Sequence, residues 1–263
     1  MSYSIGRIRK SFNACADEMP VTFRYILRPI SVYVTFIVLK AKITNPNIAT
    51  GTHLALGLAS LALLISPEKT FFVSGAFLYI LAYIFDFVDG NIARVTDSAS
   101  YYGKFLDGTV DALLGALFPI VIGVHMYFTN NNWLFLLMGA CVGFIVLFAC
   151  YLLTRASFCN YWLKADMYEK KTQAPSSKPD RTNPLKTNKF PIKKIGNISN
   201  DMKIAGLLVA AVTGVTTILF MLILASLALW AILLIIAVML EAPEQLNVHR
   251  ISKFDSRLRQ NIG

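Results

Sequence analysis

The stretch DFVDGNIARVTDSASYYGKFLDGTVD, residues 86–111, joins two apolar runs at 71–85 and 112–128. Each run is shorter than the roughly 20 residues that a membrane-spanning helix needs. Each reaches that length only when the adjoining half of the polar stretch is added, so we expect both helices to continue through it. The chain has only 15 acidic residues, yet four of them lie on the ends of these two predicted spans: Asp86, Asp89, Asp107 and Asp111.

The remainder of the chain is also strongly apolar. Of the 263 residues, 56% are hydrophobic and only 15% are charged, which is unlike a soluble domain. Further apolar runs cover 48–66 and 133–154, and the run at 204–240 is long enough for two helices joined by a tight turn. The sequence therefore predicts an all-α membrane protein with six transmembrane helices within residues 45–240.

Three polar segments lie outside these runs. Residues 1–44 surround an apolar stretch, Val32–Leu39, that is too short to span, and we expect an amphipathic juxtamembrane helix there. Pro46 can begin the first span within its first turn. Residues 164–203 contain four prolines and many lysines and should form a mostly irregular loop, and residues 241–263 form a polar tail.

Basic residues predict the orientation, because short loops rich in Lys and Arg stay in the cytoplasm. With six spans and a cytoplasmic N-terminus, all of the 25 Lys and Arg residues except Lys69 lie on the cytoplasmic side. Both termini and the four aspartates then face the cytoplasm. The net charge of +10 follows from this orientation, and no recognition motif for nucleic acid accompanies it.

The spacing of the aspartates predicts that their carboxylates converge. Asp86 and Asp89 are three residues apart and Asp107 and Asp111 are four apart, so each pair shares a helix face. Four carboxylates in a low-dielectric setting repel one another unless cations neutralise them. Oxygen ligands favour Mg²⁺ or Mn²⁺, and two such ions commonly promote displacement at phosphorus.

Other interpretations of these acids remain open at this point. They could cap helix ends or pair with Arg94 and Lys104, although four acids are costly within spans. A divalent-cation transporter could also use intramembrane aspartates, but transport would not explain the small residues spaced between them. His125 lies roughly 21 Å along a helix from Asp111, so we expect it to have a structural role.

The pattern D-x-x-D-G-x-x-A-R, a gap of eight residues, then G-x-x-x-D-x-x-x-D resembles the signature of the CDP-alcohol phosphotransferase family. Pro46, Asn47 and Thr50 are also similar to a segment often found before the first span of that family. The resemblance is tight over residues 86–111 and looser over the six-span layout. Every motif position is matched: Asp86, Asp89, Gly90, Ala93, Arg94, Gly103, Asp107 and Asp111.

The resemblance implies roles for these residues. Two divalent cations, Mg²⁺ or Mn²⁺, would be held by Asp86, Asp89, Asp107 and Asp111. Asp111 would also be the catalytic general base. The cytidine nucleotide would be bound by Asp86, Gly90, Ala93, Arg94 and Gly103. Further candidates for contacts with substrate phosphates are Asn47, Thr50, Lys104 and Arg155, of which the last two could equally be ordinary basic residues of the cytoplasmic face.

The implied reaction is a step of phospholipid biosynthesis in which a substituted phosphate passes from a CDP-linked donor to an alcohol and CMP is released. We expect CDP-diacylglycerol as donor and a small polar alcohol as acceptor, because a cavity open to lipid suits a lipid donor. The reverse arrangement, in which CDP-choline or CDP-ethanolamine donates to a lipid alcohol, stays open because both donors share CMP and phosphate. Dimers are common in the family, so a homodimer is also an open alternative.

Overall fold

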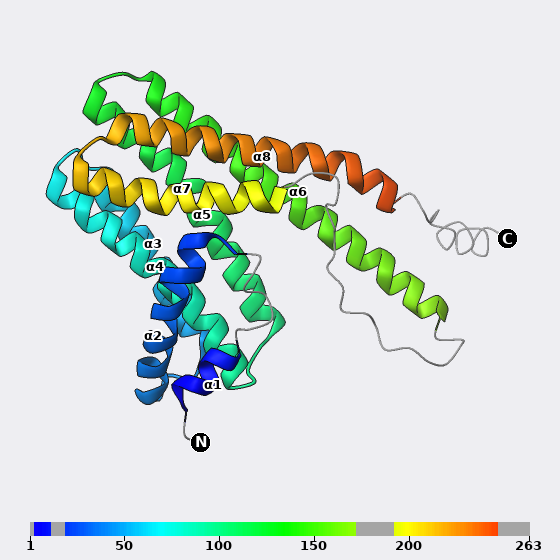
Figure 1. Ribbon diagram of the computed structural model, residues 1–263. Helices are drawn as coiled ribbons and strands as arrows, with labels where there is room; N and C mark the ends of the chain where they lie inside the picture. Colours follow the sequence, from blue (N-terminus) through cyan, green and yellow to red (C-terminus); the bar gives the residue numbers. More distant parts are fainter. Residues whose placement is uncertain (1–2, 12–18, 172–191, 247–263) are drawn as a thin grey trace. The chain divides into compact units, whose positions relative to one another are not determined.

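The computed structural model describes residues 3–11, 19–171 and 192–246, and in this part of the chain every regular element is a helix (Figure 1). The chain divides into two compact units. The first comprises residues 1–147 and 193–230, and the second comprises residues 148–192 and 231–263. All eight motif residues belong to the first unit, so the site can be described within it.

The N-terminal part of the first unit forms α1 (Ile5–Lys10), a π-helical turn η2 (Phe23–Leu27) and α2 (Arg28–Lys40). A helix was predicted around Val32–Leu39, and α2 confirms it. Its polarity differs from that of a simple amphipathic surface helix, because the face packed against the bundle carries the buried hydroxyls of Ser31 and Thr35. Its position along the membrane surface stays a prediction.

Asp201, on α7 (Ile192–Thr213), fixes the start of this N-terminal helical segment. Its carboxylate accepts hydrogen bonds from the backbone N–H groups of Val21 and Thr22, each at 2.8 Å, and from the Thr22 hydroxyl at 2.5 Å. The first backbone N–H groups of a helix have no partner within it, so an acidic side chain here acts as a cap supplied by another helix.

Five helices in the described part of the chain are long and apolar enough to cross a membrane. They are α3 (Pro46–Leu64), α4 (Lys69–Val95), α5 (Tyr101–Asn130), α6 (Leu134–Lys171) and α8 (Thr216–Leu246). The two predicted helices of the 204–240 run are α7 and α8, which separate at Gly214 with φ +75°. The predicted count of six is therefore approximate, because the polar first half of α7 makes this helix less hydrophobic than the other five.

The segment 164–203 is more helical than predicted. Helix α6 continues to Lys171 and α7 begins at Ile192, so both ends of this segment are helical, and residues 172–191 lie outside the described part. The four prolines on which the prediction rested lie at positions 175 to 191, and the flanking residues 164–171 and 192–203 contain no proline. Helix α8 likewise extends to Leu246, past the predicted start of the polar tail.

Close helix crossings bring α3, α4 and α5 together. Ser60 on α3 donates a buried hydrogen bond to the Gly75 carbonyl of α4 at 2.9 Å, and a Cβ atom on Gly75 would lie 3.0 Å from the Leu64 backbone nitrogen. A Cβ atom on Gly57 of α3 would lie 2.5 Å from the Leu114 side chain of α5. Small residues thus let α3 lie against both helices that carry the motif.

His125 has the structural role that its position predicted. Its side chain is buried, Nδ1 lies 3.0 Å from the Ser66 carbonyl oxygen, and the ring packs 4.8 Å from Phe72 and 5.4 Å from Phe220. These contacts tie the end of α5 to the α3–α4 connection and to α8, and they explain this polar residue without a catalytic function.

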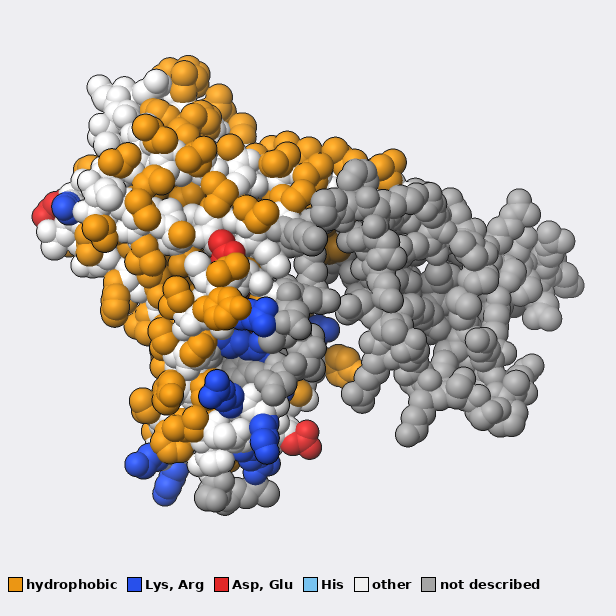
Figure 2. Space-filling view, in the orientation of Figure 1, with side chains coloured by type: hydrophobic (Ala, Val, Ile, Leu, Met, Phe, Trp, Pro, Cys, Tyr) orange, Lys and Arg blue, Asp and Glu red, His pale blue; other side chains and the backbone are white. Residues whose placement is uncertain are grey.

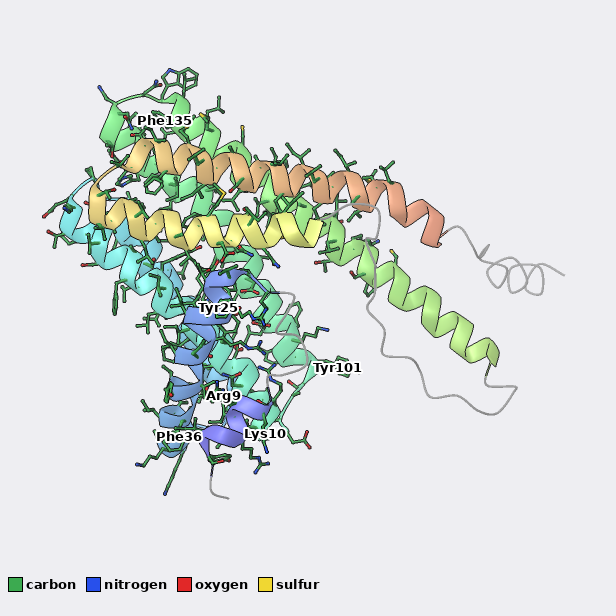
Figure 3. All side chains as sticks on the ribbon, in the orientation of Figure 1. Arg9, Lys10, Tyr25, Phe36, Tyr101 and Phe135 are labelled. Carbon is green, nitrogen blue, oxygen red and sulfur yellow. The ribbon has the colours of Figure 1, made fainter. Side chains whose placement is uncertain are left out.

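The first unit has a basic end and an apolar body. On the face shown in Figure 2, Lys and Arg side chains gather around α1 and α2, whereas hydrophobic side chains cover most of the helices beyond them. Arg9 and Lys10 of α1 lie toward the same end of the unit as Tyr101 at the start of α5, and Phe135 at the start of α6 lies at the other end (Figure 3). The junction of α4 and α5, where the motif lies, is therefore at the basic end.

Candidate active site

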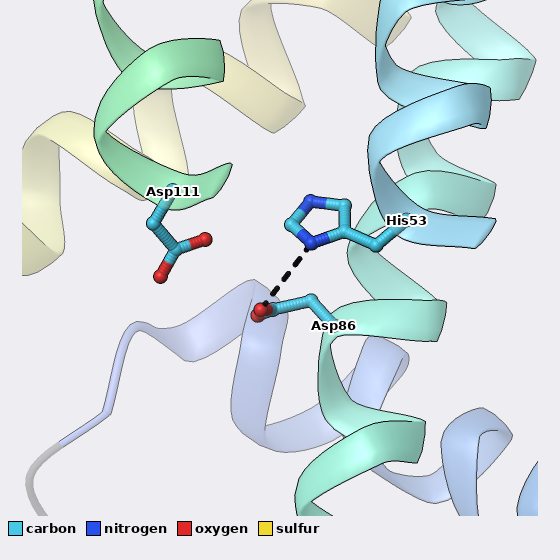
Figure 4. A group of neighbouring side chains, drawn as sticks. All are labelled: His53, Asp86 and Asp111. Atoms are coloured by element: carbon cyan, nitrogen blue, oxygen red, sulfur yellow. Dashed lines mark ion pairs between the residues drawn. The ribbon is translucent and has the colours of Figure 1, made fainter. Parts of the chain in front are cut away.

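Three helices contribute one side chain each to the centre of the site. His53 of α3, Asp86 of α4 and Asp111 of α5 offer ligand atoms that all lie within 4.8 Å of one another (Figure 4). His53 Nδ1 is 3.7 Å from Asp86 Oδ1, and the two side chains are 3% and 18% exposed. Asp111 is the exposed member of the group, so it is the carboxylate most accessible to a substrate.

Asp89 is held by a residue of α3. The Thr50 hydroxyl donates to Asp89 Oδ2 at 2.6 Å, and both side chains are buried. The same hydroxyl is 3.3 Å from the Pro46 carbonyl, but it has a single proton and the geometry favours the carboxylate. Thr50 was predicted as a candidate phosphate contact; in the structure its nearest partner is a motif aspartate.

The four motif carboxylates interact with one another. Asp86 lies close enough to Asp89, Asp107 and Asp111 for their charges to interact, and Asp107 also interacts with Asp89 and Asp111. The predicted convergence of the two motif halves is therefore what the fold produces. The helix caps considered from sequence do not describe these acids, since all four lie within α4 and α5 and well inside the helix ends.

A pocket of about 150 Å³ opens beside Asp89 and Asp107. It brings together three of the predicted nucleotide-binding residues and three of the candidate phosphate contacts. The residues that line it are Pro46, Asn47, Thr50, Asp89, Gly90, Ala93, Ala99, Ser100, Gly103, Lys104 and Asp107. Three helices and the α4–α5 connection thus enclose it, with small residues forming much of its wall.

Two predicted nucleotide-binding residues do not line this pocket directly. Asp86 faces His53 and Asp111 instead. Arg94 lies across Gly90, because a Cβ atom on Gly90 would be 3.2 Å from both Nη atoms of the guanidinium. Arg94 is therefore at the edge of the pocket, and the absence of a side chain at position 90 makes room for its guanidinium.

Several buried polar atoms in this region lack a hydrogen-bond partner. Among the described residues they include His53 Nδ1, Asn47 Oδ1 and Asp107 Oδ1. Buried polar atoms are nearly always satisfied, so such atoms at one site mark a place where a ligand or ordered water can bind. The carboxylate oxygens suit a hard divalent cation such as Mg²⁺ or Mn²⁺, whereas the His53 nitrogen beside them is a ligand for a transition metal such as Mn²⁺ rather than for Mg²⁺.

Lys203 is a functional candidate that the sequence analysis missed. It lies on α7, is only 6% exposed, and donates from Nζ to the Tyr83 hydroxyl at 2.8 Å. Its charge interacts with Asp86 and Asp111. A single lysine at the start of a long apolar run is the signal that could have found it, because a buried lysine needs an acidic partner.

His53 was also missed, although a signal for it existed. It follows Thr50 by three residues on a predicted span, so the two side chains share a helix face. Arg155, by contrast, lies on α6 in the second unit, where its guanidinium packs 5.8 Å from the Phe158 ring centre. Its contact with a substrate phosphate stays a prediction.

Comparison with known proteins identifies the family. A family model described as CDP-alcohol phosphatidyltransferase matches residues 43–242, which includes the motif, the pocket and Lys203. A search of curated proteins found no match. The matched segment is most of the chain and begins just before α3, where the site begins. This multi-pass membrane protein therefore belongs to the CDP-alcohol phosphatidyltransferase family, whose members are transferases of substituted phosphate groups in phospholipid biosynthesis.

Proposed function

We propose that this protein transfers a phosphatidyl group from CDP-diacylglycerol to the hydroxyl of a small polar alcohol. The observation that carries the proposal is the meeting of four carboxylates beside a pocket walled by glycine and alanine. The family matched over residues 43–242 supports phosphatidyl transfer from a CDP-alcohol. The choice of a lipid donor rests on the position of the motif on apolar helices, where we expect acyl chains to enter from the bilayer.

In this proposal, two divalent cations, Mg²⁺ or Mn²⁺, are held by the motif aspartates, and His53 Nδ1, close to Asp86 and Asp111, is an additional ligand atom when the ion is Mn²⁺. The unpartnered His53 Nδ1 and Asp107 Oδ1 support it. Bound cations would neutralise negative charge on the diphosphate. Thr50 orients Asp89 for this role, because its hydroxyl already satisfies one of the carboxylate oxygens.

Asp111 is proposed as the general base. The acceptor oxygen attacks the β-phosphorus as its proton passes to an Asp111 oxygen, and the bond between the β-phosphorus and the oxygen of CMP breaks. CMP leaves with that electron pair, so no covalent enzyme intermediate is required. Asp111 is the most exposed of the central residues, which supports access for a soluble acceptor.

The nucleotide is proposed to lie along the pocket wall formed by Gly90, Ala93 and Gly103. Small side chains there permit close approach of the ligand to the α4 and α5 backbones. Lys104 lines the same pocket and Arg94 lies at its edge, so both of these basic side chains are placed to meet phosphate oxygens.

We also propose that this end of the molecule faces the cytoplasm. Lys and Arg gather at α1 and α2, and the motif lies at the same end of the first unit (Figures 2 and 3). Basic segments that flank spans remain in the cytoplasm, so the substrate pocket would open to that side.

The test is CMP release by the purified protein with CDP-diacylglycerol, a panel of polar alcohols and either Mg²⁺ or Mn²⁺. We expect release that requires the cation and an acceptor, and that falls by about a hundredfold or more in Asp111→Asn, since loss of a general base typically costs that much. The matched control is Asp97→Asn, because Asp97 lies between the motif halves with φ +54°, a conformation that asparagine tolerates.

Each alternative predicts a different outcome. CMP release only from CDP-choline or CDP-ethanolamine with diacylglycerol would overturn the proposed donor. Full activity in Asp111→Asn would overturn its role as the base. Cation flux into proteoliposomes without any CMP release would instead support the transporter considered from sequence.

A further inference from the structure

We propose that Ser31, Thr35 and Asn91 are positioning residues that orient the Arg94 guanidinium at the nucleotide pocket. Through them helix α2, which is too short to be one of the five candidate spans, takes part in donor binding. The inference rests on the proposed function, because it assigns Arg94 to the CDP moiety of the donor.

Asn91 links α2 to Arg94 by hydrogen bonds. Its side chain is fully buried, although the neighbouring Gly90 and Ala93 line the pocket. Its Nδ2 donates to Thr35 Oγ1 at 3.0 Å and to Ser31 Oγ at 3.4 Å. On the other side, its Oδ1 accepts from Arg94 Nη2 at 2.9 Å.

The direction of these hydrogen bonds is fixed by the backbone of α2. The Thr35 hydroxyl donates to the Ser31 carbonyl at 2.6 Å, and the Ser31 hydroxyl donates to the Arg28 carbonyl at 2.9 Å. A hydroxyl has one proton, so both oxygens can only accept from Asn91. The Asn91 amide must therefore present nitrogen to α2 and oxygen to Arg94, and a flipped amide would lose hydrogen bonds on both sides.

This arrangement holds a long cationic side chain in place before the substrate binds. The guanidinium lies across Gly90, where a Cβ atom would be 3.2 Å from both Nη atoms. Arginine loses considerable rotamer freedom when it is immobilised, so orienting it in advance lowers the cost of binding a phosphate. The buried hydroxyls on α2 thereby have a function at the pocket in addition to filling a helix interface.

The test compares Thr35→Val, which removes the acceptor at nearly constant volume, with Thr35→Ser, which retains it. We expect Thr35→Val to weaken CMP binding in the presence of Mg²⁺ by about fivefold, the usual effect of one lost hydrogen bond, while Thr35→Ser binds like wild type. The KM for the CDP-linked donor should rise by a similar factor with little change in kcat. Thr52→Val is the control, because the Thr52 hydroxyl also donates to a carbonyl four residues earlier.

A double-mutant cycle separates positioning from stability. If Thr35 acts through Arg94, adding Thr35→Val to Arg94→Ala should weaken CMP binding no further. Additive effects, or a lower Tm of Thr35→Val with unchanged CMP affinity, would show a purely structural role and overturn the inference. Ser31→Ala provides a milder variant should Thr35→Val fail to fold, and it should shift CMP affinity in the same direction.

The same measurements distinguish this inference from the proposed function. Wild-type protein that releases and binds CMP, with variants that bind CMP equally well, would refute only the positioning role. Wild-type protein that neither binds CMP nor releases it from any CDP-linked donor would refute both.

Discussion

Replacing Thr50 by valine tests whether the hydrogen bond to Asp89 prepares the site for a cation. Valine has nearly the same shape, but it leaves Asp89 Oδ2 without the donor that now lies at 2.6 Å. A hydrogen bond to a charged group contributes roughly 1.5–3 kcal/mol, which corresponds to about a 10- to 150-fold change in an equilibrium constant. Both side chains are largely buried and meet solvent only through the pocket that they line, so water from the pocket can replace the lost donor only in part.

The assay is Mn²⁺ binding to the purified protein, followed through the electron paramagnetic resonance signal of the free ion. We expect the Mn²⁺ affinity of Thr50→Val to fall by about 10- to 100-fold, the usual effect of losing a group that orients a metal ligand. Thr52→Val, two residues away on the same helix, should bind Mn²⁺ like wild type because its hydroxyl donates to the Ile48 carbonyl. An unchanged affinity in Thr50→Val would refute the assignment of Asp89 as a prepared ligand.

Two other substitutions test the helix packing and the buried cation. Gly123→Ala should lower the free energy of unfolding by about 1–3 kcal/mol, because the added Cβ would lie 2.6 Å from the Phe135 carbonyl oxygen of α6. The loss of stability would be measured as a lower Tm. Gly115→Ala on the same helix meets open space and should leave Tm unchanged; equal Tm values for the two variants would contradict the packing argument. Lys203→Met should reduce kcat/KM for CMP release by about tenfold, because it removes the charge-assisted hydrogen bond to Tyr83 and a positive charge beside Asp111. Full activity of this variant would show that Lys203 is not needed at the site.

The sequence predicted the two helices that carry the motif well, since span length and helical periodicity leave little freedom there. The runs beside Asp86 and Asp111 reach the length of a span only if the motif is helical, and α4 and α5 are indeed continuous through both motif halves. The side chains then share faces by geometry alone. The same reasoning about small residues placed Gly90 and Gly103 at the pocket wall.

Residues outside the motif could not be assigned to the site, because the contacts between separate helices depend on helix packing. His53 and Lys203 come from α3 and α7, and which of their faces meets α4 is decided by the crossings between helices. Asn91 occupies one of the variable positions of the motif, so the motif itself gives no reason to single it out. Its partners Ser31 and Thr35 depend on which face of α2 packs against α4. The apolar pattern of residues 32–39 does not specify that face, since the exposed face of α2 is apolar as well.

The balance of charge at the site gives a reason for binding cations and donor together. Four motif carboxylates are opposed by two basic groups that interact with them, Lys203 with Asp86 and Asp111, and Arg94 with Asp89. In this count the site has an excess of two negative charges, and the diphosphate of a CDP-linked donor would add two more. Lys104, which lines the pocket, reduces this total to three, and two divalent cations would more than compensate it. We therefore expect each ligand to strengthen binding of the other, as reciprocal coupling requires, and a donor without cations to be repelled.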